Sequence, residues 1–193
     1  MDYTPAFLTA FNSAMLYEVG PFFNATDPDV IAGTTGTPQQ NRNVGFTNTA
    51  GDAGGVTKFG IAQNSHPSID VASLTLDQAM QIYVSDYWTP SGCPSIAGPV
   101  SIIHFDGCVN NGVGRACKFL QEAAGVTPVD GRIGPNSIAT INAIDPATLI
   151  HQISSIRSNY YNTIVQNNPA QSKFLNGWLN RIAAVTQLAL SQI

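Results

Sequence analysis

Charged side chains are scarce in this 193-residue chain, and their scarcity excludes several classes of protein. Asp, Glu, Lys and Arg make up only 10% of the sequence, against about 25% in ordinary soluble domains. The 8 Lys and Arg residues are scattered and the net charge is -4, so no basic stripe is present to bind nucleic acid. Any polyanionic or sugar substrate would have to be held by hydrogen bonds and stacking in a cleft, without long-range attraction.

Cysteine and histidine are also few. The three cysteines are odd in number and lack CxxC spacing, which argues against a disulfide framework and a thiolate zinc site: Cys93, Cys108 and Cys117. We expect buried, reduced thiols at these positions. The three histidines show no ligand spacing, so we expect neither a metal nor another cofactor: His66, His104 and His151.

Long apolar runs are absent. No stretch approaches the roughly 18 residues that a membrane-spanning helix needs, so we expect no membrane insertion. The N-terminal segment has no basic region followed by an uninterrupted apolar core and does not resemble a secretory signal. We expect synthesis in a cytoplasm with no export route of its own, and one compact, monomeric body.

Helical patterns are what the chain does contain. Apolar residues recur at helical spacing and predict about seven helices, which include in order Phe7, Leu76, Val100, Leu120, Pro135, Leu149 and Phe174. A capping box at Thr75 and Gln78, Pro99 at a first helical position, and the pair Asp145-Pro146 mark helix starts. With one small β element, these helices predict an α+β fold that is predominantly α-helical.

Two segments interrupt the helices. Asn24 to Gly51 is rich in Asn, Thr, Gly, Pro and Gln, and we expect a long loop that forms a flap or a loose excursion, with room for a hairpin. Next, Gly51 to Ala62 reads GDAGGVTKFGIA, a glycine turn followed by the only convincing strand.

Glu18 stands out among the charged residues, because it continues an apolar stripe along the first predicted helix. That stripe consists of Phe7, Leu8, Phe11, Ala14 and Met15. Partial burial and the negative end of the helix dipole both favour a protonated carboxyl group there, as a general acid requires. The alternative is an ordinary glutamate that extends into solvent from the helix end.

A second carboxylate follows in the glycine turn. Asp52 lies in a polar setting, five residues before Thr57. A carboxylic acid in apolar surroundings together with a carboxylate in polar surroundings is the division of roles that glycosidases use.

At these residues the chain resembles glycoside hydrolase family 108, the N-acetylmuramidases of phage endolysins and bacterial muralytic proteins. The family's Glu-Gly-Gly-Tyr signature corresponds to Tyr17-Glu18-Val19-Gly20, and its Asp-Pro-Gly-Gly-x-Thr-x-x-Gly-Ile segment corresponds to DAGGVTKFGI from Asp52. Further similar segments are LTLDQAMQIYVSDYW from Leu74, FDGCVNNGVGRACKFLQ from Phe105, VDGRIGPNSIATINA from Val129 and FLNGWLNRIAAV from Phe174.

The resemblance implies a lysozyme-like fold and a catalytic role for three residues. Glu18 is the implied catalytic acid, and Asp52 and Thr57 are the implied holders of the attacking water. The family's second carboxylate follows closely after the Glu, so Asp27 is a rival to Asp52. Val19 replaces the glycine after the Glu, and the signature aromatic is displaced to Phe22.

The resemblance also implies a peptidoglycan-binding region towards the C-terminus. We expect residues 1–98 to form the catalytic part and residues 99–193 a helical lobe, which could equally be the ordinary second lobe of a lysozyme. Asp106 and Asn110, one turn apart on an apolar face, either line the cleft or are buried structural polar residues. Trp88, at a helix end, is a candidate for stacking on sugar.

The predicted function is a peptidoglycan hydrolase that cleaves the β-1,4 bond between N-acetylmuramic acid and N-acetylglucosamine. A phage endolysin of this kind would stay in the host cytoplasm until lysis and act on the wall after release through a holin. Two alternatives are a lytic transglycosylase, which needs only the acid, and a non-catalytic wall-binding or virion structural protein.

Overall fold

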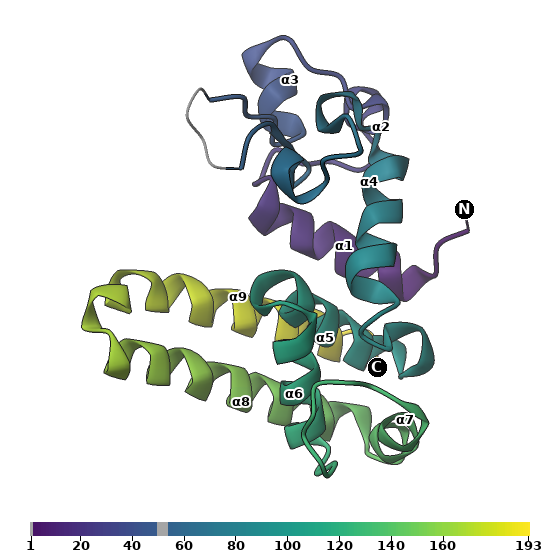
Figure 1. Ribbon diagram of the computed structural model, residues 1–193. Helices are drawn as coiled ribbons and strands as arrows, with labels where there is room; N and C mark the ends of the chain where they lie inside the picture. The colour runs from purple at the N-terminus through teal and green to yellow at the C-terminus, as the bar shows by residue number, and fades with distance from the viewer. Residues whose placement is uncertain (1, 50–53) are drawn as a thin grey trace. The chain divides into compact units, whose positions relative to one another are not determined.

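The computed structural model describes residues 2–49 and 54–193. Over these residues the protein is predominantly helical, with nine α-helices and one two-stranded sheet (Figure 1). The chain divides into two compact units, one of residues 11–85 and one of residues 1–10 with 86–193, called the helical unit below. These bounds describe compact units, and the division into a catalytic part of residues 1–98 and a helical lobe of residues 99–193 stays a prediction. Among the described residues, no helix combines the length and apolarity that crossing a membrane requires.

Helix α1, Pro5–Glu18, ends where the sequence predicted. Four of its five stripe residues are buried, whereas Leu8 is 38% exposed. The backbone amides of Val19 and Gly20 both donate to the Met15 carbonyl, and Gly20 has a φ of 112°, which stops the helix directly after Glu18.

The segment from Asn24 to Gly51 is more regular than expected. It contains α2, Pro28–Ala32, and α3, Pro38–Asn43. Asp27 caps α2, and Thr37 caps α3 in a capping box with Gln40. These two short helices account for the difference between the seven predicted helices and the nine observed among the described residues.

The small β element is a hairpin of β1, Thr57–Lys58, and β2, Ile61–Ala62. Thr47 forms an isolated antiparallel bridge with Thr57 on the other side of β1. Two 3₁₀ turns, η1 at Gln63–Ser65 and η2 at Val71–Ser73, connect the hairpin to α4, Leu76–Tyr83. The predicted Thr75/Gln78 capping box is confirmed at the start of α4, and a π-helical turn, η3 at Val84–Trp88, continues it.

The helical unit contains the long helices. Its core forms between α5, α6, α8 and α9, and α8 and α9 lie side by side (Figure 1). The predicted starts at Pro135 and at Asp145-Pro146 are confirmed, and the helix predicted to start at Pro99 starts one residue earlier, at Gly98. The elements are η4, Cys93–Ser95; α5, Gly98–Asn111; α6, Val113–Ala123; α7, Pro135–Asn142; α8, Pro146–Asn167; η5, Pro169–Gln171; and α9, Ser172–Leu190.

The thiols are free and buried, as predicted. Burial raises the pKa of Cys93 to about 12 and that of Cys117 to about 11, and it also raises the pKa of Cys108. They therefore stay protonated and unreactive near neutral pH.

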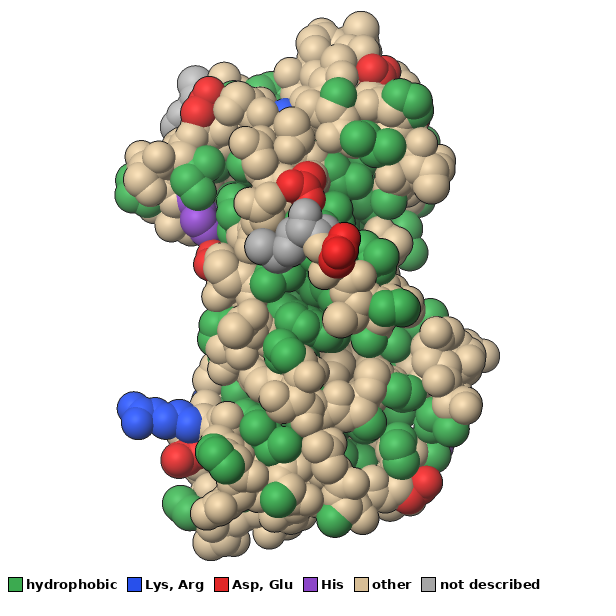
Figure 2. All heavy atoms as spheres, turned by 90° about the vertical axis from the view of Figure 1, so that its right-hand side faces the viewer, with side chains coloured by type: hydrophobic (Ala, Val, Ile, Leu, Met, Phe, Trp, Pro, Cys, Tyr) green, Lys and Arg blue, Asp and Glu red, His purple; other side chains and the backbone are tan. Residues whose placement is uncertain are grey.

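The surface shown in Figure 2 carries few charged side chains, in keeping with the 10% of charged residues in the sequence.

Candidate active site

Glu18 lies at the C-terminal end of α1, partly exposed, against the turn of the β hairpin. A Cβ atom added at Gly60 would lie 2.9 Å from Glu18 Cβ and 2.7 Å from Tyr83 Oη. Only glycine leaves room for the glutamate side chain at this position. The hairpin turn therefore fixes the surroundings of the candidate acid.

The turn itself needs unusual backbone angles. Phe59 and Gly60 connect the two strands with φ values of 52° and 73°, as a two-residue hairpin turn requires. Tyr83 Oη donates a hydrogen bond to the Phe59 carbonyl at 3.0 Å. Tyr83 also packs edge-on against Phe11 of α1, with ring centroids 5.3 Å apart. Helices α1 and α4 thus hold the turn that contacts Glu18.

Thr57 belongs to the same hairpin. Its backbone amide and carbonyl both bond to Thr47, at 2.9 Å each, and the side chain is partly exposed. Successive side chains of a strand point to opposite faces, so Thr57 and the buried Lys58 point in opposite directions. Asp52, the predicted partner of Thr57, lies outside the described residues.

Lys58 fastens the hairpin from its buried side. Its ammonium group donates hydrogen bonds to the Gly33 carbonyl at 2.5 Å and to the Ala72 carbonyl at 2.9 Å. The side chain is 1% exposed, and burial lowers the pKa of Lys58. This lysine connects β1 to the end of α2 and to η2, so its role is structural.

A mostly apolar groove of about 350 Å³ begins at the residue after Glu18. We call it the Arg42 groove; its lining is Val19, Pro21, Phe22, Asn41, Arg42, Gly45, Phe46 and Thr47. The Arg42 guanidinium lies 5.4 Å from the centre of the exposed Phe22 ring and bonds to Gln39. Since Thr47 pairs with Thr57, the groove extends from the chain neighbour of Glu18 to the strand partner of Thr57.

Asp27, the rival second carboxylate, has a local structural role. Its Oδ1 accepts the Asp29 amide hydrogen bond at 2.8 Å and caps α2. Capping alone accounts for an acidic residue at this position.

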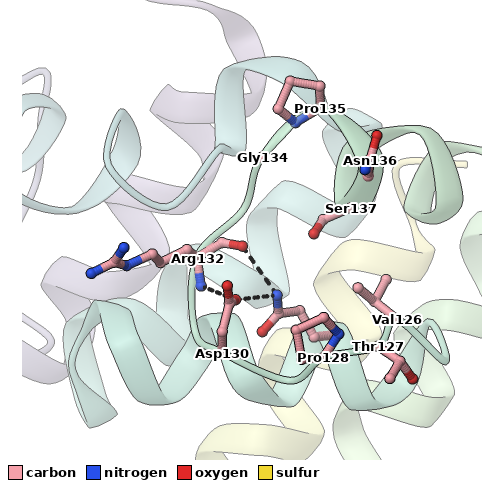
Figure 3. Close-up of a pocket in the computed structure, with 10 residues that line it drawn as sticks. Val126, Thr127, Pro128, Asp130, Arg132, Gly134, Pro135, Asn136 and Ser137 are labelled. Carbon is pink, nitrogen blue, oxygen red and sulfur yellow. Dashed lines mark hydrogen bonds between the residues drawn. The ribbon is translucent and has the colours of Figure 1, made fainter.

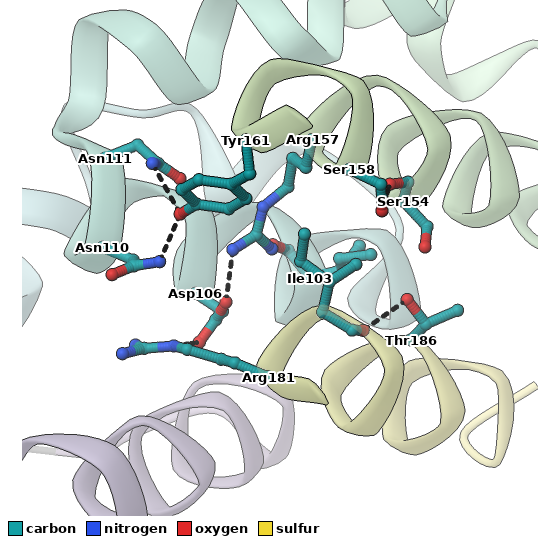
Figure 4. Close-up of polar contacts among 11 residues, drawn as sticks. Ile103, Asp106, Asn110, Asn111, Ser154, Arg157, Ser158, Tyr161, Arg181 and Thr186 are labelled. Atoms are coloured by element: carbon teal, nitrogen blue, oxygen red, sulfur yellow. Dashed lines mark hydrogen bonds and ion pairs between the residues drawn. The ribbon is translucent and has the colours of Figure 1, made fainter. Parts of the chain in front are cut away.

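Asp106 and Asn110 lie in the helical unit (Figure 4). Asp106 is 1% exposed and pairs with Arg157 at 2.7 Å and with Arg181 at 2.8 Å. Asn110 donates to the Tyr161 hydroxyl at 2.6 Å. This network favours the structural alternative for both residues, because their polar groups bond within the protein.

Trp88 is buried at 5% exposure. Its ring packs edge-on against Phe7 and Phe105, with centroids 5.3 and 5.5 Å away. The packing favours a core role over sugar stacking. Across the described ranges, no three His, Cys, Asp or Glu side chains are grouped so that they could hold a metal ion.

Comparison with known proteins connects this site to a family. Residues 40–112 match the family described as Glycosyl hydrolase 108, and residues 115–183 match a Predicted Peptidoglycan domain. The structure of SagA from Brucella abortus is similar, with a TM-score of 0.65, 22% identity and 94% coverage of each chain, which shows a shared fold. No curated protein matches.

The two matched regions support a glycoside hydrolase with peptidoglycan as its substrate or partner. Residues 40–112 match glycosyl hydrolase family 108, so the predicted resemblance is confirmed for this part of the chain. The matched residues 40–112 include Thr57 and Gly60 but begin after Glu18. The role of Glu18 therefore rests on its geometry and on the sequence motif.

Sequence reasoning missed three features of this site. The tight turn at Phe59-Gly60 has only a weak sequence signal, because such turns favour Asn, Asp or Gly at the position that Phe59 occupies. The hydrogen bond from Tyr83 to the hairpin has no sequence signal, because the two residues are 24 positions apart. The Arg42 groove depends on α3, which Thr37-Pro38 and Gln40 could have revealed.

Proposed function

We propose that this protein is a lysozyme-like N-acetylmuramidase that hydrolyses the β-1,4 bond between N-acetylmuramic acid and N-acetylglucosamine in peptidoglycan. Glu18 is the general acid that protonates the leaving glycosidic oxygen while water adds to the sugar carbon. One observation carries the proposal: the Glu18 side chain lies against the hairpin turn of the region that matches glycosyl hydrolase 108.

The Arg42 groove supports a polymeric sugar substrate. Phe22 and Phe46 offer aromatic surface for sugar rings, which have apolar faces, directly beside the candidate acid. Arg42 and Lys58 are the only Lys or Arg residues between positions 11 and 85, and Lys58 is buried. Arg42 is thus available to pair with a carboxylate of peptidoglycan's peptide chains.

The second carboxylate in this proposal is Asp52, which activates the attacking water together with Thr57. Its assignment rests on the sequence motif and on the position of Thr57 in the hairpin. We predict that Asp52→Asn lowers the turnover rate by at least about 10²-fold, the usual contribution of a general base.

Asp27→Asn is the matched comparison, because asparagine caps helices as well as aspartate does and should preserve α2. This variant should keep nearly full activity. A larger loss in Asp27→Asn than in Asp52→Asn would transfer the base role to Asp27.

The reaction products test the proposal directly. Mass spectrometry of digested peptidoglycan should show reducing-end N-acetylmuramic acid with one added water. If Asp52 acts through water, the carboxyl groups stand about 6.5–9.5 Å apart and the fresh product is the α anomer. A β anomer would make Asp52 a nucleophile, whereas 1,6-anhydro products would replace hydrolysis with transglycosylation.

We further propose that the protein acts as an endolysin that reaches the wall after a holin permeabilises the membrane. Cells that express it should lyse only when their membrane is permeabilised. Lysis of intact expressing cells, with no permeabilising agent, would contradict this route.

A further inference from the structure

The helical unit has a second pocket, which the proposed glycosidase chemistry does not use. It has a volume of about 460 Å³ and lies between the loop of residues 126–134 and the start of α7 (Figure 3). We call it the α7 pocket. It falls within residues 115–183, the part of the chain that matches the Predicted Peptidoglycan domain.

A buried glutamine of α6 binds the loop that forms this pocket. Gln121 of α6 is 1% exposed and donates to Asp130 Oδ1 at 2.8 Å and to the Arg132 carbonyl at 3.0 Å. Its own carbonyl oxygen accepts the Gly131 amide at 2.8 Å. Two of these bonds fix the loop backbone and the third fixes the Asp130 side chain, so the pocket is built before any ligand arrives.

The opposite wall is a helix start with unused hydrogen-bond donors. Gly134, the residue before α7, provides no side-chain cap, and the first helical bond runs from the Ile138 amide to the Gly134 carbonyl. Within the described ranges, the amides of Asn136 and Ser137 donate to no other group. Such a helix start favours a negatively charged ligand.

Ser137 is a second and separate sign of a ligand. The residue is 7% exposed, and its hydroxyl makes no hydrogen bond in the part of the chain that the structure describes. Figure 3 shows this hydroxyl pointing from α7 into the pocket. The Ser137 side chain is largely enclosed while its hydroxyl remains free to donate, so a bound acceptor would complete its hydrogen bonding.

Asp130 supplies the complementary charge. Its Oδ1 accepts the Gln121 side chain and the Arg132 amide, and these bonds lower the pKa of Asp130, so it is a carboxylate near neutral pH. Its Oδ2 can accept from a ligand. The Arg132 guanidinium points away from Ser137 in Figure 3 and does not supply the positive end of the pocket. Val126 and Pro128 add apolar surface.

We propose that the α7 pocket binds the free carboxyl end of a short peptide with small side chains. The carboxylate accepts from the Asn136 and Ser137 amides and the Ser137 hydroxyl, a peptide N–H or ammonium group donates to Asp130, and methyl groups pack on Val126 and Pro128. Peptidoglycan stem peptides that end in alanine have this chemistry. The choice of peptidoglycan peptides rests on the peptidoglycan match and does not depend on Glu18 being catalytic.

The test is an NMR titration of the full chain with D-alanyl-D-alanine. The amide signals of Asn136, Ser137 and Gly131 should shift and saturate, whereas D-alanyl-D-alanine amide, which lacks the carboxylate, should bind at least about tenfold more weakly. N-acetylglucosamine should leave these signals unchanged. Saturable shifts with the sugar and none with the dipeptide would overturn the proposal in favour of a glycan site.

Four variants separate binding from folding and from catalysis. Ser137→Ala should weaken dipeptide binding about tenfold or more, and Ala139→Ser, at an exposed position of the same helix, should leave it unchanged. Asn136→Asp places a carboxylate in the first turn of α7, which favours the helix but repels the ligand. It should abolish binding without lowering the melting temperature. Unaltered binding in Asn136→Asp would contradict the proposal.

Glu18→Gln should bind the dipeptide as the parent protein does. Dipeptide binding and lytic activity are therefore measured on independent sites, and a failure of the glycosidase assignment would not affect the binding result.

Discussion

The two units of this protein are stabilised by different means. The helical unit has long helices, of 22 residues in α8 and 19 in α9, and pairs its interior charges with one another. The unit of residues 11–85 relies on short elements, such as the 5-residue α2 and strands of 2 residues. Those elements are joined by capping bonds and by single side chains such as Lys58 and Tyr83.

The difference shows how to distinguish a structural carboxylate from a functional one. Asp106 and Glu18 both lie on apolar stretches of sequence. Asp106 is buried and bonded to two arginines, so it can neither reach a ligand nor exchange a proton with one. Glu18 is partly exposed at a helix end, directly before a groove. The surroundings of each carboxylate, and not its sequence pattern, separate the two roles.

Breaking the ion network of the helical unit should have the largest effect on stability. Asp106→Asn leaves the charges of Arg157 and Arg181 buried without their counter-ion, and we expect a loss of about 3–5 kcal/mol. Urea unfolding monitored by tryptophan fluorescence measures it, because both tryptophans, Trp88 and Trp178, belong to the helical unit. A loss below about 1 kcal/mol, with exposed Glu122→Gln as reference, would refute the role of the network.

The helical unit should also lose stability in acid, because burial lowers the pKa of His104 to about 4. The unfolded chain takes up a proton near pH 6.5, whereas the folded chain does so only near pH 4. Above pH 6.5 the neutral imidazole of His104 therefore costs the folded state nothing relative to the unfolded chain. As the pH drops to about 4, the free energy of unfolding falls by about 3 kcal/mol because only the unfolded chain is protonated at this group. Stability curves measured from pH 7 to pH 4 should be flatter for His104→Gln; parallel curves would exclude this contribution.

A smaller effect on stability is expected in the unit of residues 11–85. Gly60→Ala puts alanine at a φ of 73° and places its Cβ against Tyr83 and Glu18, so we expect a loss of about 1–3 kcal/mol. Hydrogen exchange of the hairpin amides measures it. Since the turn contacts Glu18, lytic activity should also fall by about 10²-fold.

Gly177→Ala is the matched control, since an added Cβ meets nothing in helix α9. It should stabilise the helical unit by up to about 1 kcal/mol. Equal behaviour of the two glycine variants would mean that the hairpin turn does not position the glutamate.

The sequence predicted the helices of the helical unit well, because each carries a long apolar stripe and a start signal such as Pro99 or Asp145. It missed α2 and α3, whose few residues cannot show a helical period and which depend on their caps. It singled out Glu18 and Thr57, but the contact of Gly60 with Glu18 arises from chain folding over many residues. The two arginine partners of Asp106 are 51 and 75 residues away, so no local pattern reveals them.

The central claim is that Glu18 in the unit of residues 11–85 is the catalytic acid. The direct measurement is the clearing of outer-membrane-stripped cells by Glu18→Gln, with Glu122→Gln as control, because the chain has only these two glutamates. Glu18→Gln keeps the side-chain shape and removes the transferable proton. It should lose at least about 10²–10⁴-fold in rate with an unchanged circular dichroism spectrum, and Glu122→Gln should match the parent protein. More than a tenth of the activity remaining in folded Glu18→Gln would contradict the claim.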